Sequence, residues 1–174
     1  MQLFDSTVIR AHVPAADAKG GRMEALGRSR GGFSAKIHLK TGLDGYPAGF
    51  HLTGGEASGS RNFEALLDPG PDVDPRAVVA APSASSGGYD AKTNREAARK
   101  RGICPAIPYR SNTIGKPKFF AKVLHKARAR IEQMMGKIKR FKRIALRCGK
   151  PARNYASFLA LVCGFILIKS VHTA

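Results

Sequence analysis

Residues 33–52 read FSAKIHLKTGLDGYPAGFHL, and this stretch decides the fold class of the 174-residue chain. Apolar and polar residues alternate through 33–40 and again through 48–52, which is the period-two pattern of β-strands with one buried face. Residues 44–47, Asp-Gly-Tyr-Pro, are a turn signal between the two runs. The stretch therefore predicts a β-hairpin, with His38 among the solvated residues of its polar face.

Helical periods and short apolar runs surround this hairpin. The expected elements are strands at 1–12, 77–80 and 103–109, helices at 61–67 (capped by Ser60) and 92–101, and loops at 11–32 and 81–88. A basic helix within 116–150 and an apolar helix at 155–170 complete the chain. Strands that alternate with helices predict one α/β domain over residues 1–174, with helices layered on a mixed sheet.

The charge of the chain is strongly positive and unevenly distributed. Thirty Lys and Arg against twelve Asp and Glu give a formal net charge of +18. Thirteen of the basic residues lie within 116–150, together with a single carboxylate, Glu132. Such an excess repels itself unless an anion lies nearby. The charge therefore favours a polyanionic partner, nucleic acid first and an acidic membrane surface second.

The last two segments differ in character. Apolar residues recur at helical spacing through 116–150, which predicts a helix with one apolar side on the core. The apolar run at 155–168 is shorter than the roughly twenty residues that span a bilayer, so we expect a buried terminal helix rather than a membrane anchor. Three cysteines and no secretory signal pattern favour a reducing cytoplasm.

Two carboxylates stand out by their surroundings. Asp5 lies at the end of an apolar strand, where burial is costly unless the charge is paired or binds a metal. Glu132 shares one polar stripe of the basic helix with three neighbours, His125, Arg128 and Lys139. One interpretation is an i,i+4 ion pair of Arg128 with Glu132 on a solvated helix. The other is that Asp5 and Glu132 together hold a divalent cation such as Mg²⁺ for phosphoryl displacement.

Four motifs, in order along the chain, resemble the DDE transposases of bacterial insertion sequences, in the group with a ribonuclease H-like catalytic domain. They are Asp5–His12 for the first-aspartate motif, Gly27–His38 for the next block, Gly88–Asp90 for the end of the second-aspartate motif, and Arg128, Glu132 and Lys139 for the third-carboxylate signature. That signature reads Tyr, two residues, Arg, three residues, Glu, six residues, Lys. The resemblance covers almost the whole chain, and the ordered set is far more specific than any one motif.

The resemblance implies a ribonuclease H-like α/β fold, a mixed sheet with helices on both faces. It implies metal-dependent DNA strand cleavage and transfer in the bacterial cytoplasm, at the nucleoid, with Asp5 and Glu132 as catalytic ligands of Mg²⁺ or Mn²⁺. The implied partner is double-stranded DNA, at transposon ends and target, with self-association on DNA and no membrane. Candidate DNA-binding residues are Arg128, Lys139, Arg140, Lys142 and Arg143, and candidate supporting residues are His125 and Asp90.

Three departures from the family pattern matter. The second aspartate is missing, because its position falls on Ala81 when counted from the preceding strand and on Ser86 when counted back from Gly88. His125 stands where the signature has Tyr. The chain starts almost at the first aspartate, so we expect a copy truncated before that point, without the family's upstream DNA-recognition region. With one carboxylate lost, we expect cleavage to be weak or nil unless Asp90 takes the missing place.

Two other functions stay open at this point. A non-catalytic DNA-binding remnant would bind through the basic helix and interfere with intact transposase by mixed assembly. A basic RNA-binding protein of the ribosomal kind would explain the charge but not Asp5 or the spacing of Arg128, Glu132 and Lys139. Trp is absent and aromatic content is only 7%, so stacking platforms for single strands are poorly supplied.

Overall fold

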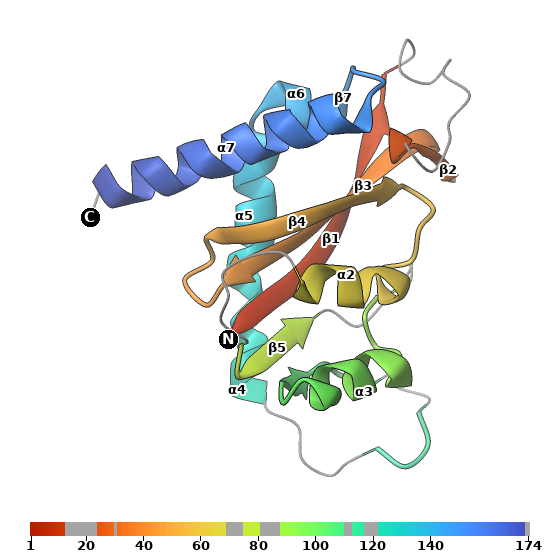
Figure 1. Ribbon diagram of the computed structural model, residues 1–174, viewed down its shortest axis with the longest axis vertical. Helices are drawn as coiled ribbons and strands as arrows, with labels where there is room; N and C mark the ends of the chain where they lie inside the picture. Colours follow the sequence, from red (N-terminus) through yellow and green to blue (C-terminus); the bar gives the residue numbers. More distant parts are fainter. Residues whose placement is uncertain are drawn as a thin grey trace.

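The structure, a computed structural model, describes residues 1–12, 24–29, 31–68, 75–80, 88–109, 113–116 and 122–172. Its central strand is β1 (Gln2–Ala11), which pairs antiparallel with β3 (Gly32–Gly42) and parallel with β5 (Ala77–Ala80). The remaining strands are β2 (Gly27–Ser29), β4 (Pro47–Gly54), β6 (Cys104–Ala106) and β7 (Leu146–Arg147). The order is β2-β3-β1-β5-β6, with β4 on β3 and β7 on β1. This mixed sheet confirms the predicted α/β class (Figure 1).

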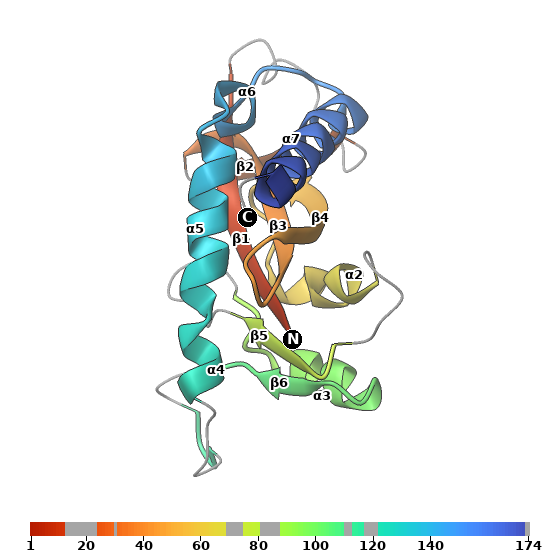
Figure 2. The ribbon, with the colours of Figure 1, turned by 90° about the vertical axis from the view of Figure 1, so that its left-hand side faces the viewer.

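Helices cover both faces of the sheet (Figure 2). One face carries the 3-10 turn η2 (Ser60–Asn62), α2 (Phe63–Leu67) and α3 (Lys92–Lys100). The other carries α4 (Lys122–Lys126), α5 (Arg128–Lys139), α6 (Lys142–Ala145) and α7 (Ala152–His172). Alternate residues of β1 serve two separate apolar cores, because successive side chains of a strand point to opposite faces. Leu3 packs on the side of α5 and α7, whereas Phe4 packs with α2 and α3.

The predicted hairpin is confirmed as β3 and β4. Its turn requires glycine at Gly45, whose φ of +87° lies in the left-handed region and where an added Cβ would stand 3.1 Å from Cβ of Arg130. The backbone amide of Tyr46 donates to Oδ1 of Asp44 over 3.0 Å and fixes the turn. The register shifts once, between Lys40 and Thr41.

The polar face of β3 is buried, and the prediction that His38 is solvated is wrong. The His38 ring is fully buried, with Nδ1 3.1 Å from the Tyr89 hydroxyl and Nε2 2.9 Å from Oγ1 of Thr53. Burial is the main cause that lowers its pKa to about 3, with the neighbouring Lys36 charge as a second. This face is closed because α2 packs on β3 and Tyr89 reaches the His38 ring, which an alternating pattern does not reveal.

The other predicted helices and strands differ from the observed ones by a few residues at their ends. The helix predicted at 61–67 begins as η2, and Ser60 does not cap it but accepts a hydrogen bond from the Asn94 amide over 3.0 Å. The helix predicted at 92–101 is confirmed as α3 and is followed by Gly102 at φ +72°. The strand at 77–80 is confirmed, the strand predicted at 103–109 is limited to β6, and β2 lies within the loop predicted at 11–32. Residues 13–23, 30 and 81–87 lie outside the described residues.

The basic segment 116–150 is not one helix. Its described part divides into α4, α5, α6 and β7, with breaks at Ala127 and Phe141. Phe141 has an extended backbone (ψ 107°), which separates α5 from α6, and its side chain packs beside the core. Ile144 of α6 is buried in the same core. The segment does carry apolar residues at helical spacing, but within its described part they are divided among three separate helices, α4, α5 and α6.

The terminal helix is longer and less buried than predicted. α7 runs over 21 residues, and only one stripe of it enters the core, formed by Tyr155, Leu159, Val162 and Cys163. Length and composition would allow it to cross a membrane, and among the described helices it is alone in this. The same stripe packs against α5, α6 and β4, so in this structure α7 is a layer of the domain.

Arg147 joins the start of α7 to the body of the domain. Its guanidinium is fully buried and donates to four backbone carbonyls, those of Glu24, Ala25, Gly149 and Lys150, at 2.6–3.1 Å. It also lies 5.1 Å from the Tyr155 ring centroid. Carbonyl oxygens accept the hydrogen bonds that a carboxylate would otherwise accept, and they engage all three nitrogens of the buried guanidinium.

We expect Arg147→Ala to lower the free energy of unfolding by about 3 kcal/mol, because four backbone carbonyls around a buried guanidinium lose their donor. Urea denaturation followed by far-UV circular dichroism measures the change. Arg153→Ala, at an exposed position of α7, is the control and should stay within about 0.5 kcal/mol of the original protein. A loss for Arg147→Ala no larger than the control's would contradict the role assigned to the guanidinium.

Candidate functional site

The sequence predicted that Asp5 lies at the end of a strand, but in the structure it lies inside β1. It stands opposite Leu39 of β3 in the sheet register. Its side chain retains 17% of its exposure, and Oδ1 accepts a hydrogen bond from the Ser6 backbone amide over 2.8 Å. The carboxylate is therefore largely withdrawn from water on the face of the sheet that α5 covers.

Arg128 connects Asp5 to Glu132. One guanidinium nitrogen, Nη2, lies 3.6 Å from Oδ2 of Asp5 and 2.7 Å from Oε1 of Glu132. The contact with Glu132 is the i,i+4 pair of one helix, whereas the contact with Asp5 crosses from α5 to β1. Two carboxylates from opposite ends of the chain thus flank one positive charge.

The pKa of Asp5 reflects this setting. Burial is the largest influence and raises the pKa above its ordinary value, and the charge of Glu132 raises it further. The Ser6 amide and the Arg128 charge act in the opposite direction. Burial and the Arg128 charge lower the pKa of His125, on the last turn of α4, which places its ring near the same charges.

Oxygen ligands of this kind suit Mg²⁺ or Mn²⁺, but the described residues supply only two of them. Within that part of the chain, no group of three or more His, Cys, Asp or Glu side chains could hold a metal ion. Asp90 is therefore not gathered with Asp5 and Glu132. Its backbone carbonyl instead accepts a hydrogen bond from Arg95 on α3. Ala81 and Ser86, the two alignment positions of the missing aspartate, lie outside the described residues.

The other predicted basic residues form a separate group. Lys139 lies seven residues beyond Glu132, which is about two turns or 10 Å along the helix axis. It belongs with three further exposed cations at the end of α5 and on α6, namely Arg140, Lys142 and Arg143. Of the predicted basic set, Arg128 contacts the carboxylates, whereas the other four lie exposed and away from them.

Sequence reasoning missed a polar network under β1. The Tyr89 hydroxyl contacts the Ser6 side chain and the His38 ring, and His38 in turn contacts Thr53. Ser6 is also the residue whose amide binds Asp5, so the network supports the backbone at the buried carboxylate. The register of β1 on β3 pairs Ser6 with His38. The sequence offered no signal that Tyr89 would reach this point from beyond β5.

Comparison with known proteins gives two matches. A family model described as "Transposase DDE domain" matches residues 2–167. A Burkholderia cepacia protein named "Putative transposase for insertion sequence element IS402" is 29% identical over 149 residues, which cover 80% of this chain. The same residues cover 65% of that protein, so the chain spans less than two thirds of this relative's length.

We expect Arg128→Gln to raise the pKa of Asp5 further, because the charge that opposes the effect of burial is removed. A titration of the Asp5 carboxyl carbon by NMR measures the shift. Because the Asp5 pKa is raised in the folded state, folding stability falls as the pH rises from the ordinary value of 3.8 through the folded value. Arg128→Gln should extend this fall to higher pH.

Lys139→Gln removes the same unit of charge from the same helix without touching Asp5, and it should leave the titration unchanged. Glu132→Gln should move the Asp5 pKa downward, since a like charge disappears. An Asp5 pKa that stays constant or falls in Arg128→Gln would show that Arg128 does not stabilise the carboxylate.

Proposed function

The chain belongs to the transposase DDE domain family, and on that premise we propose that it acts on double-stranded DNA in insertion-sequence transposition. The proposed activity is metal-dependent cleavage and transfer of DNA strands at transposon ends and target. The observation that supports it most is the shared contact of Asp5 and Glu132 with Arg128. Metal-dependent strand cleavage requires carboxylates that converge on the place where a cation can bind.

Asp5 and Glu132 are the residues that would hold Mg²⁺ or Mn²⁺, since both present carboxylate oxygens. A bound ion of this kind activates water and stabilises the leaving oxygen in phosphoryl displacement. The two side chains do not complete a two-ion centre, because the described residues add no third ligand to them. We therefore propose that strand cleavage by this chain is weak or absent.

Arg128 has a positioning role in this proposal. Its guanidinium already contacts both carboxylates, offsets part of their combined charge and keeps the two like charges at one place. A divalent cation would have to compete with this resident charge for the same oxygens. This competition is a second physical reason for weak metal binding, independent of the missing aspartate.

The exposed cations at the end of α5 and on α6 are proposed to bind the DNA backbone. They are Lys139, Arg140, Lys142 and Arg143. Phosphate contacts of this type give affinity without base specificity, and they release counterions on binding. The proposed place of action is therefore where bacterial DNA lies, in the cytoplasm at the nucleoid.

The incomplete carboxylate set favours one alternative function. A remnant that binds DNA without cutting it would compete with intact transposase at the transposon ends or join it in mixed assemblies. Self-association on DNA belongs to this alternative, since mixed assembly requires contacts between copies. Lowered transposition by an intact enzyme in the presence of excess chain, without nicking by the chain alone, would favour it.

On a supercoiled plasmid that carries the ends of the element, with Mg²⁺ or Mn²⁺, we expect nicking to be slow or undetectable. Whatever nicking occurs should disappear in Glu132→Gln, because one of two metal-binding carboxylates is lost. Glu96→Gln is the matched control, since Glu96 also forms an exposed i,i+4 ion pair, with Lys92 on α3. Agarose gel electrophoresis measures both. Nicking that persists in Glu132→Gln would exclude this carboxylate from the reaction.

DNA binding should weaken steeply with salt, and Lys139→Gln combined with Lys142→Gln should reduce the slope of log K against log salt by about 2. The reason is that each lysine releases about one counterion from the DNA. Fluorescence anisotropy with a labelled duplex measures the slope. Arg99→Gln combined with Lys100→Gln, which removes two exposed cations from α3 on the other face, should leave it unchanged. Equal losses in both pairs would mean that binding follows net charge alone.

A further inference from the structure

The outer side of α7 carries apolar side chains that none of the described residues covers. They include Leu161, Phe165 and Ile168, which are 70%, 54% and 62% exposed. With Phe158 they recur at intervals of three and four residues, so they form one stripe along the helix. Exposed apolar stripes of this kind are uncommon on monomeric proteins and mark interaction sites.

Two adjoining hollows follow this stripe. One, of about 490 Å³, lies between the end of α5 and α7, and the other, of about 480 Å³, lies between α6 and α7. Phe141 and Phe165 line both, and their rings meet edge to face at 6.1 Å. We call the two hollows together the α6–α7 groove. Its floor includes aliphatic side chains such as Ile144 and Val162.

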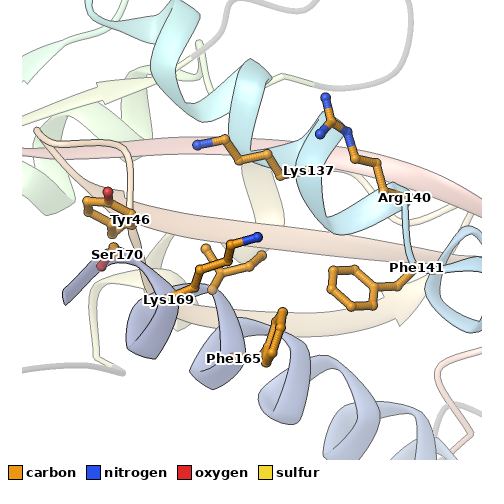
Figure 3. A pocket seen from close by; sticks show the side chains of 8 residues that line it. Tyr46, Lys137, Arg140, Phe141, Phe165, Lys169 and Ser170 are labelled. Carbon is orange, nitrogen blue, oxygen red and sulfur yellow. The ribbon is translucent and has the colours of Figure 1, made fainter. Parts of the chain in front are cut away.

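Positive charge surrounds this floor. Figure 3 shows Lys137 and Lys169 reaching over the first hollow from α5 and α7, with Arg140 beside them. Lys142 and Arg143 line the second hollow, and the Arg143 guanidinium lies 5.3 Å from the Phe158 ring centroid. Among the described residues, none that lines either hollow is acidic. The groove therefore combines an apolar floor with a cationic rim.

We propose that the α6–α7 groove docks an acidic amphipathic helix of a partner protein. From Phe158 to Lys169 the groove follows α7 for about 16 Å, which is three turns of helix. A helix of that length would place apolar residues at i, i+3 or i+4, and i+7 on the floor. Asp and Glu on its flanks would meet the lysines and arginines of the rim.

The chemistry of the groove discriminates among occupants. Nucleic acid matches the cations but has nothing to bury against Ile144, Leu161 and Val162. A second copy of this chain is a poor match, because each described helix carries at most one carboxylate and each copy carries a charge of +18. A bilayer surface is flat, whereas this apolar floor is concave. The proposal does not depend on strand cleavage, since none of these residues belongs to the carboxylate site. Arg140, Lys142 and Arg143 are shared with the proposed DNA contacts, so DNA and the partner helix would compete for these three cations.

The test uses the full chain and a fluorescein-labelled helical peptide of about 18 residues, with Leu at i, i+3, i+4 and i+7 and Glu on both flanks. Fluorescence anisotropy near physiological ionic strength gives the affinity. Leu161→Asp should weaken binding at least about tenfold, because it puts a repelling charge on the floor. Lys169→Glu, which leaves the floor intact, should weaken it in the same direction. Val123→Asp, at an 80% exposed position of α4, makes the same charge change outside the groove and should stay within about twofold.

Each competing outcome would overturn the proposal. Equal weakening by Leu161→Asp and Val123→Asp, or equal affinity for a peptide of scrambled sequence, would show attraction by net charge alone. Binding to vesicles of phosphatidylcholine with about one third phosphatidylglycerol, sensitive to Leu161→Asp and without peptide binding, would assign the groove to a lipid surface. A dimer in sedimentation equilibrium that Leu161→Asp dissociates, again without peptide binding, would assign it to a second copy.

Discussion

A carboxylate on the central strand of a sheet that helices cover on both faces has to be neutralised, and the candidate site depends on this constraint. Asp5 meets it with the Ser6 amide and the Arg128 guanidinium. Arg128 reaches Asp5 only when α5 lies across β1, and the buried side chains of α5, among them Ile131 and Ile138, hold the helix there. The packing of one helix and the electrostatics of the site are therefore a single arrangement.

The part of the fold that could be predicted from sequence is the part encoded locally. Alternation and turn residues at 33–52 are sufficient for the β3–β4 hairpin, and helical spacing is sufficient for α3. The burial of the polar face of β3 could not be predicted in the same way, because α2 and Tyr89, which lie further along the chain, close it. Lys36 and Lys40 tolerate that closure because their stems are apolar and their ammonium groups reach the carbonyls of Ala57 and Leu67.

The contacts of the candidate site also differ in whether the local sequence could predict them. The contact of Arg128 with Glu132 is a property of helix spacing, and the sequence was enough to raise it as one interpretation. The contact of Arg128 with Asp5 requires the assembled sheet, and so does the network through Tyr89 and His38. The family match extends over residues 2–167. It gives a reason to consider Asp5 and Glu132 together, which the spacing of residues within one helix or strand does not give.

The four carbonyls gathered by Arg147 have a consequence for biosynthesis. Glu24 and Ala25 leave the ribosome more than 120 residues before their guanidinium partner. The β1–β3–β4 portion can form early, but the surface that will receive α7 stays open until residues 152–172 have been made. Between the synthesis of β4 and that of α7 the nascent chain therefore carries an uncovered apolar face, and chaperones that recognise such surfaces have that interval in which to bind it.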